Sequence, residues 1–305
     1  MSEKTLKQLV GALAVVAVLW IAATLVTRAG DGSIEGGADL AVFFEGVDAA
    51  SVDEARILRP ADTIRLMRQG DGWQVNGFRA DSGAVARFFQ ALQDAEVGDL
   101  VATNPANHER MGVSTDSART LVLQVGGSTR SLMFGDEGPR PSTIYARGLD
   151  TDEVYLVGSV LFTHVRRQLD DWRNRRMLAI DTTRVARVEV RRDQESYTLL
   201  RADTMWTFAD GSAARAVQVA ALMRELGGGL VAAGFVPDGD SLAALPQGGS
   251  TVAYSAEGDV LAEVAIGGGE RDRWGMVVGD SVRYRLPDFR VSSIAPTLEA
   301  LAPPE

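Results

Sequence analysis

The chain has 305 residues, of which 46% are hydrophobic, and this is enough for two domains with cores of their own. Its formal net charge of −10 argues against a nucleic-acid partner, because nucleic-acid phosphates are bound by basic surfaces. The sequence has no cysteine, which excludes disulfides, thiol nucleophiles, thiolate metal sites and a lipidated cysteine.

An apolar run near the start of the chain predicts a membrane anchor. Residues 9–26 are apolar except for Thr24. A helix rises about 1.5 Å per residue, so this run nearly crosses a hydrocarbon core of about 30 Å. Lys4 and Lys7 precede it, which places the N-terminus in the cytoplasm. We therefore predict a cytoplasmic start and a transmembrane helix over residues 1–29. A cleaved signal peptide and a buried soluble helix are the alternatives.

Residues 30–50 are predicted to form a linker. Residues 30–37 are polar and rich in glycine, which is typical of a flexible segment. Farther on, Val42, Phe43 and Phe44 predict a short strand or a turn of helix that docks on the first module.

Residues 51–169 have the pattern of a strand-rich first module. Short alternating apolar runs separated by turn residues predict strands. These strands cover residues 55–59, 63–68, 72–76, 120–125, 131–134, 143–146 and 154–157. The last four form a predicted antiparallel meander. A helix is predicted over residues 83–93, with Asp81 or Ser82 as its N-cap, and a second helix over residues 160–169.

Residues 170–181 form a charged junction, for which two interpretations exist. Arginine recognises carboxylates in a bidentate manner, so Trp172, Arg173, Arg175 and Arg176 are candidate partner-binding residues. Alternatively, the segment is a connector whose charges pair locally and whose Trp172 packs between the two halves. Runs of surface charge usually face solvent, which favours the connector.

Residues 182–305 repeat the layout of the first module. Residues 185–226 match residues 52–92, because in both stretches two alternating runs, a lone tryptophan and an apolar helical stripe follow one another. Further strands are predicted at residues 230–236, 251–255, 260–266, 274–278 and 282–286. A last helix is predicted around residues 294–301, beginning at Pro296.

The predicted fold class is therefore α+β. An N-terminal transmembrane helix is followed by two tandem repeats of an antiparallel-sheet module, each with about seven or eight strands and two helices.

No pattern typical of a catalytic or metal centre is present in the sequence. The two histidines, His108 and His164, lie in unlike elements, and neither has a second histidine at ligand spacing. The glycines at residues 267–269 are not followed by the Lys-Ser/Thr pair of a phosphate-binding loop. We therefore predict no catalytic residue, no metal and no cofactor.

Four motifs together carry a resemblance that covers nearly everything after the linker. They are Gly72-Trp73-Gln74-Val75 before a helix, Met111-Gly112-Val113, Glu153-Val154-Tyr155-Leu156-Val157, and Asp171-Trp172-Arg173-Asn174-Arg175-Arg176-Met177-Leu178 leading to Ile180-Asp181. With these motifs and the N-terminal anchor, the chain resembles a bacterial family known only as a domain of unknown function. Its members are membrane-anchored proteins with a duplicated strand-rich extracytoplasmic region, often encoded beside gliding-motility-type ABC transporters. The second copy departs from the pattern at Tyr284-Arg285-Leu286-Pro287.

The resemblance implies an accessory or scaffold role near a transporter complex, and it brings no catalytic residues with it. We expect a non-enzymatic, single-pass protein of the bacterial inner membrane, with an extracytoplasmic body that binds a protein partner such as an ABC-type transporter. The alternative is an extracytoplasmic ligand-binding protein with its cleft between the two modules.

Overall fold

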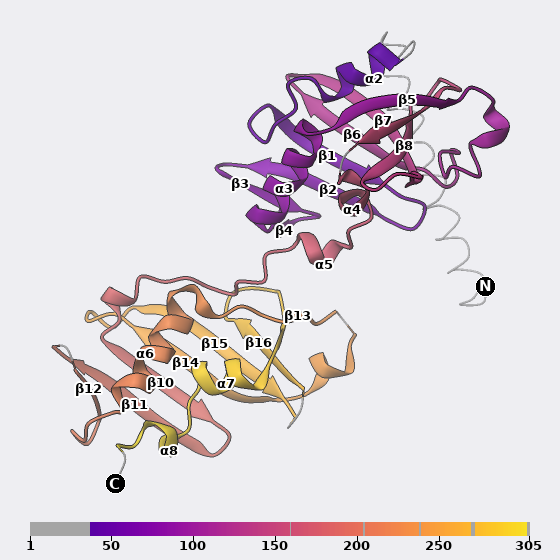
Figure 1. Ribbon diagram of the computed structural model, residues 1–305. Coiled ribbons are helices and arrows are strands. Elements are labelled where there is room, and N and C mark those ends of the chain that lie inside the picture. Colours follow the sequence, from indigo (N-terminus) through magenta and orange to yellow (C-terminus); the bar gives the residue numbers. More distant parts are fainter. Residues whose placement is uncertain (1–36, 159, 204, 238, 270–271, 304–305) are drawn as a thin grey trace, which may run out of the picture. The chain divides into compact units, whose positions relative to one another are not determined.

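The computed structural model describes residues 37–158, 160–203, 205–237, 239–269 and 272–303 (Figure 1). The anchor predicted over residues 1–29 and the start of the linker lie outside these ranges. Within them, no helix is both long and apolar enough to cross a membrane. The chain divides into two compact units, Met1–Trp172 and Arg173–Glu305. Each contains one antiparallel sheet and a few short helices, so the fold is α+β with two strand-rich modules.

The first module is built on a nine-stranded sheet in the order β4-β3-β2-β1-β6-β7-β8-β9-β5. Its strands are β1 Val52–Leu58, β2 Thr63–Gln69, β3 Gly72–Val75, β4 Phe78–Arg79, β5 Glu96–Ala102, β6 Arg119–Val125, β7 Ser128–Glu137, β8 Thr143–Arg147 and β9 Val154–Gly158. Every pairing is antiparallel. Side chains alternate between the faces of a strand, so Ala55 and Ile57 reach the core while Glu54 and Arg56 lie on the opposite face.

Helices cover one face of this sheet. They are α2 Gly37–Phe44, α3 Ser82–Gln93, α4 Leu161–Val165 and α5 Leu169–Trp172. The module also contains a 3-10 turn, η1, at Pro105–Asn107. The predicted N-cap of α3 is confirmed, because the Asp81 carboxylate accepts a hydrogen bond of 2.6 Å from the Ala84 N–H. Val85 and Phe88 lie on the buried stripe of α3. Of the two structures predicted for the segment around Phe43, a short strand or a turn of helix, the structure shows a helix.

The Met111-Gly112-Val113 motif packs on the other face of the sheet. Met111 and Val113 are buried in a small cluster with Ala102 and Val154. The Met111 carbonyl accepts from the Asp136 N–H at 3.0 Å, and the Val113 carbonyl accepts from Arg147 Nε at 2.7 Å. Burial lowers the pKa of Arg147, whose guanidinium is held by backbone carbonyls. Met111 and Val113 of the motif therefore have a structural role, since their side chains are buried and their carbonyls bind the sheet and Arg147.

Gly135→Ala is expected to lower the free energy of unfolding of the first module by about 1–3 kcal/mol. Gly135 lies under the motif, and an added Cβ would stand 2.1 Å from the Met111 carbonyl oxygen. Gly158→Ala is the matched control, since its nearest contact is the Glu96 carbonyl oxygen at 3.8 Å. Urea unfolding followed by hydrogen exchange of first-module peptides measures both variants. Equal stabilities would show that the loop yields to the new methyl group.

The second module is built on an eight-stranded sheet in the order β12-β11-β10-β14-β15-β16-β17-β13. Its strands are β10 Arg187–Arg192, β11 Glu195–Ala202, β12 Met205–Phe208, β13 Gly234–Phe235, β14 Gln247–Tyr254, β15 Val260–Gly268, β16 Arg273–Val277 and β17 Tyr284–Leu286. The helices are α6 Ala216–Arg224, α7 Asp288–Ile294 and α8 Leu298–Leu301. Short turns are η2 Thr182–Arg184, η3 Glu225–Gly229 and η4 Ser241–Ala244.

The two modules have the same succession of elements, which confirms the predicted duplication. In each, antiparallel strands precede a helix, a sheet-edge strand follows it, and a four-strand meander leads to two short helices. The first module has four strands before α3, and the second has three before α6, with a bridge between Thr207 and Ala213 in place of β4. The equivalence extends to single hydrogen bonds. The N–H of Asp81, which caps α3, donates to the Trp172 carbonyl at 2.7 Å, and the N–H of Arg215, which precedes α6, donates to the Leu301 carbonyl at 2.9 Å.

Three predicted elements differ in the structure. The helix predicted over residues 160–169 is divided into α4 and α5. The strand predicted at residues 230–236 is reduced to β13 and a bridge at Val231. The last helix does not begin at Pro296, because α7 ends before this residue and α8 starts after it. Proline lacks an N–H and disfavours helical geometry in the residue before it, and Ala295 accordingly has φ −133° and ψ 71°.

Candidate functional site

Trp172, the first of the predicted partner-binding residues, is a core residue of the first module. Its side chain is fully buried, with its ring 5.4 Å from that of Phe88 and 6.3 Å from that of His164. Its carbonyl is fixed by the Asp81 N–H. The structure thus places the Trp172 side chain in the core of the first module, and binding of a partner by this residue stays a prediction.

The arginines that follow belong to the second module. The Arg173 guanidinium lies 3.5 Å from the centre of the Phe235 ring. The Arg175 carbonyl accepts from the Ala232 N–H at 2.9 Å, and Arg176 forms an antiparallel bridge with Val231. This charged segment therefore pairs with residues 230–232 of the second module through an isolated β-bridge, a contact that its composition does not indicate. Binding of a partner by Arg173, Arg175 and Arg176 stays a prediction.

The helical layer of the second module exposes apolar side chains. Helices α6 and α7 cover one face of the sheet, with Val219, Leu222, Val291 and Ile294 in the core (Figure 1). On their outer sides, Val217 is 74% exposed and Phe289 is 63% exposed. By contrast, α3 of the first module presents polar Arg87 and Gln90 to solvent. The sequence contains a signal for the exposed Val217, because an alignment of the two copies places it opposite Gly83, outside the apolar stripe of the helix.

A buried ion pair joins α7 to the end of α6. Arg290 Nη1 donates to both carboxylate oxygens of Glu225, at 2.8 and 3.0 Å. The Glu225 side chain is 3% exposed and that of Arg290 is 26% exposed. The apolar periodicity of the sequence does not predict this ion pair. A glutamate at the end of a helix, such as Glu225, is usually exposed, and its partner Arg290 is 65 residues away in the sequence.

His164 is buried beside Trp172 at the position of Ile294 in the second copy. Burial lowers its pKa to about 4, and the charges of Arg167 and Arg87 contribute to the shift. Its Nδ1 has no hydrogen-bond partner among the described residues. The other histidine, His108, lies elsewhere, with Nε2 2.9 Å from the Asp152 carbonyl oxygen. No group of metal-binding side chains occurs in the described ranges.

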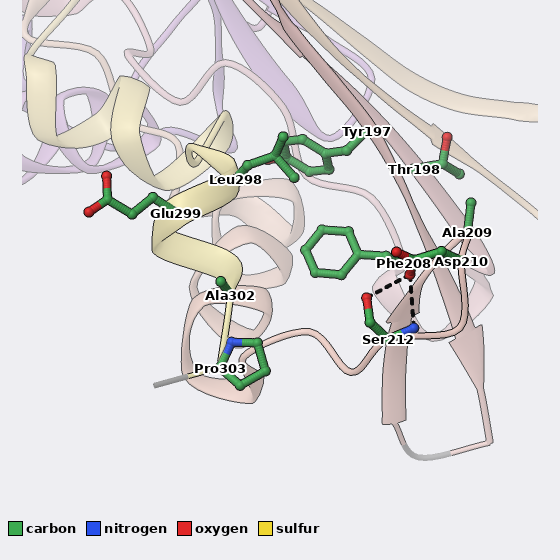
Figure 2. Close-up of a pocket in the computed structure, with 10 residues that line it drawn as sticks. All are labelled: Tyr197, Thr198, Phe208, Ala209, Asp210, Ser212, Leu298, Glu299, Ala302 and Pro303. Carbon is green, nitrogen blue, oxygen red and sulfur yellow. Dashed lines mark hydrogen bonds between the residues drawn. The ribbon is translucent and has the colours of Figure 1, made fainter. Parts of the chain in front are cut away.

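An open hollow of about 530 Å³ lies in the second module between α8, with the residues that follow it, and strands β11 and β12 (Figure 2). The rings of Tyr197 and Phe208 form one wall, 6.0 Å apart, and Leu298 lies near Tyr197. The Tyr197 hydroxyl donates to the Pro296 carbonyl at 2.5 Å, and burial raises the pKa of Tyr197. Asp210 is already engaged, since its carboxylate accepts from both the N–H and the hydroxyl of Ser212. The hollow therefore offers mainly apolar contacts.

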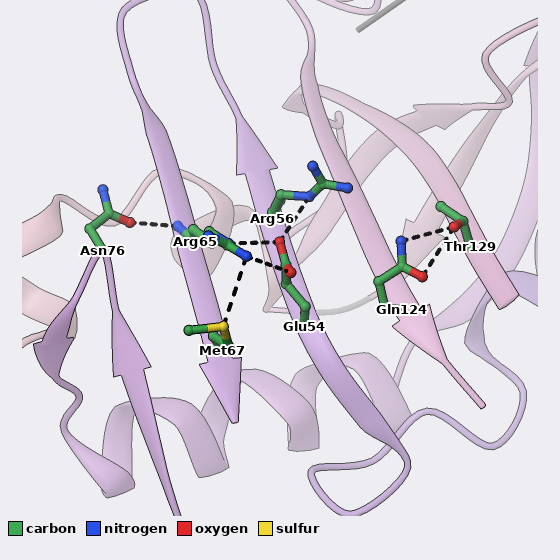
Figure 3. A network of polar contacts seen from close by, with 7 residues as sticks. All are labelled: Glu54, Arg56, Arg65, Met67, Asn76, Gln124 and Thr129. Atoms are coloured by element: carbon green, nitrogen blue, oxygen red, sulfur yellow. Dashed lines mark hydrogen bonds and ion pairs between the residues drawn. The ribbon is translucent and has the colours of Figure 1, made fainter. Parts of the chain in front are cut away.

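A polar network covers the outer face of the first sheet (Figure 3). The Glu54 carboxylate accepts from Arg65 Nε at 2.9 Å and from Arg65 Nη2 at 3.0 Å, and lies 3.2 Å from Arg56 Nε. These hydrogen bonds raise the pKa of Arg65. Gln124 and Thr129 pair with each other one strand farther on. The one carboxylate is thus shared by two arginines, an arrangement typical of ion pairs on a sheet surface.

Comparison with known proteins gives a family without an assigned activity. The model of the family described as Domain of unknown function (DUF4340) matches residues 46–247. The match spans the first module, the charged junction and the second module as far as the first residue of β14. No curated protein and no solved structure matches the chain.

Proposed function

The chain belongs to the DUF4340 family of domains of unknown function, and we propose that it is a non-enzymatic scaffold of a bacterial envelope complex. In this proposal residues 1–29 anchor it in the inner membrane with a cytoplasmic N-terminus. The two modules lie outside the membrane and bind a protein partner, for which an ABC-type transporter is the proposed candidate.

The divergence of two otherwise equivalent helical layers carries this proposal. Apart from β4, both copies keep the same order of sheet strands and helices from β1 and β10 onward, and the same hydrogen bond from the helix cap to the last helix. The most exposed large apolar side chains of the two helical layers are in the second copy, where Val217 is 74% and Phe289 is 63% exposed, whereas Val42 and Val160 of the first copy are 48% and 52% exposed. Large apolar side chains that face solvent are candidate anchors of protein interfaces, and aromatic ones are frequent among them.

Replacing Val217 and Phe289 together by serine is expected to reduce recovery of the partner at least fivefold, because both apolar anchors are lost. The measurement is affinity purification of the full chain from membranes in mild detergent, with quantitative mass spectrometry. Met205→Ser is the matched control. Met205 is 68% exposed, and strand alternation directs it to the face of the sheet opposite Trp206 and Phe208. Equal recovery with both proteins, or no stable partner in several mild detergents, would contradict the proposal.

The hollow in the second module favours an alternative, an extracytoplasmic ligand-binding protein. An apolar molecule would contact Tyr197, Phe208 and Leu298 there. Saturable binding of an apolar fluorescent dye to the full chain, abolished by Leu298→Glu, would support the alternative. Dye binding that is unaffected by the substitution would place the dye elsewhere.

A further inference from the structure

An equivalent arginine stands at the end of the first strand in both modules. Arg59 follows β1 and Arg192 ends β10, and the two occupy the same place in the repeat. Arg192 shares a strand face with the core residue Val190, so it lies at the edge of the core. Both arginines bind the chain beyond a helix of the covering layer. Arg59 Nη1 donates to the Arg167 carbonyl at 2.8 Å, and Arg192 Nη1 donates to the Ala295 carbonyl at 2.9 Å.

In the first module a carboxylate of the chain itself occupies the rest of this arginine. Asp62 lies across the β1–β2 hairpin from Arg59 and accepts from its Nε and from its Nη2, both at 2.5 Å. Two parallel hydrogen bonds of this kind are the geometry in which a guanidinium group recognises a carboxylate. The first module therefore contains a complete carboxylate site that is filled from within.

The second module leaves the corresponding part of Arg192 open. Glu195 is the equivalent of Asp62 and faces Arg192 across the β10–β11 hairpin, but its carboxylate accepts from the Leu298 N–H at 3.3 Å instead. Apart from the Ala295 carbonyl, Arg192 has no hydrogen-bond or ion-pair partner in the described ranges. Its Nε and Nη2, which match the two atoms that bind Asp62 in the first module, are thus available to another acceptor.

A narrow cavity of about 10 Å³ lies beside Arg192, with room for one water-sized group. Arg273 of β16 also lines it and has no hydrogen-bond or ion-pair partner among the residues that the structure describes. Strand β14 lies between β10 and β16 in the sheet order, and it contributes only Gly248 and Gly249 to the lining. The space between the two arginines is therefore free of side chains from the intervening strand.

The charges around this cavity favour an anion. Its lining includes Arg191, Arg192 and Arg273 but a single acidic residue, Asp193. Within the described part of the chain, Asp193 forms no ion pair with these arginines. Three positive charges against one negative charge give the cavity a positive potential, in a chain whose formal net charge is −10.

We propose that Arg192 and Arg273 bind a carboxylate group that belongs to another molecule. The carboxylate would accept from Nε and Nη2 of Arg192, as Asp62 does from Arg59, and one of its oxygens would enter the cavity beside Arg273. A planar carboxylate fits a cavity for one small group better than a phosphate, which has further oxygens to place. A small organic acid and an acidic side chain of a protein both present this group.

The test is protection of arginines from phenylglyoxal on the full chain in detergent, with the rate at each arginine measured by mass spectrometry of peptides. Acetate is the first probe, and sodium chloride at the same ionic strength is the reference. We expect acetate to slow modification of Arg192 and Arg273 by about threefold or more, because a bound carboxylate shields the guanidinium groups. Arg184, an exposed arginine of the same module, should be unaffected.

Two variants separate a built site from general attraction of anions. Arg273→Gln removes one guanidinium group and should raise the acetate concentration that protects Arg192 about tenfold. Glu195→Gln removes the nearest competing carboxylate and should lower that concentration. Arg184→Gln is the matched control and should leave it unchanged.

Equal slowing at Arg184, or equal slowing by chloride, would overturn the proposal. Protection by inorganic phosphate but not by acetate would overturn the choice of a carboxylate. A short peptide with one glutamate distinguishes the two sources: protection at a much lower concentration than acetate would assign the site to a protein side chain, and protection at the same concentration would assign it to a small organic acid. The proposal concerns the second module alone, so its outcome does not depend on the anchor or on the affinity purification.

Discussion

Arg290→Val is expected to lower the free energy of unfolding of the second module by about 3 kcal/mol. The substitution leaves the Glu225 carboxylate, with 3% of its side chain exposed, without the cation that now binds both of its oxygens. A buried charge that loses its partner keeps its desolvation cost and loses the compensating attraction. Urea unfolding, followed by hydrogen exchange of peptides from α6 and β14, measures the change within this module.

The first module supplies the control for this prediction. Ala91 and Val160 stand at the positions of Glu225 and Arg290, so the double variant Glu225→Ala with Arg290→Val copies an arrangement that the fold already contains. Replacement of a whole buried ion pair by apolar residues is often neutral, and we expect the double variant to lie within about 1 kcal/mol of the wild type. If the double variant is as unstable as Arg290→Val alone, the loss comes from packing of the arginine stem and not from the stranded carboxylate.

The duplicated fold could be predicted because its pattern is carried by side-chain alternation. Core residues such as Ile57 and Val190 recur with a period of two along the strands, and Val85 and Val219 open matching helical stripes. These patterns reflect burial against a face, which is a local property of each element. The helix cap at Asp81 was likewise readable, since a cap acts on a residue three positions away.

Elements that depend on distant partners could not be predicted in the same way. The arginine-rich segment looked like a solvated connector, yet the backbone of Arg175 and Arg176 pairs with residues 230–232, which are distant in sequence. At Pro296 two local rules conflict, since proline both starts helices and ends them. Burial of Ile294 decides the question, because α7 must place that residue against the sheet before the chain turns.

For the candidate site too, the sequence could not predict features that depend on residues distant in the chain. Trp172 was selected for its place in a charged run, but its burial depends on Phe88 and His164, which come from other elements of the first module. The exposed Val217 and Phe289 were overlooked because an apolar residue on a helix normally indicates a core position. For Val217, alignment of the two copies offers a signal, since Gly83 stands at the same position, whereas the exposure of Phe289 is seen only in the folded module.

Acidification from pH 6.5 to pH 4 is expected to remove about 3 kcal/mol of stability from the first module through His164 alone. The pKa of this histidine is lowered from 6.5 to about 4 in the folded chain, by burial first and then by Arg167 and Arg87. The unfolded chain therefore binds a proton that the folded chain excludes throughout this interval, and protonation favours unfolding. The contribution is fully present above pH 6.5 and is lost as the pH falls toward 4.

His164→Ile isolates this effect, because Ile294 occupies the same position in the second module. The variant also removes the buried Nδ1 that has no partner among the described residues. We expect it to match or exceed the wild type in stability at pH 7.5 and to lose about 3 kcal/mol less than the wild type between pH 6.5 and pH 4. Exposed carboxylates such as Asp48, whose pKa is lowered by hydrogen bonds from Ser51 and Ala50, are common to both proteins and cancel in the comparison. Parallel loss of stability in the two proteins would show that His164 takes up its proton without disturbing the core around Phe88 and Trp172.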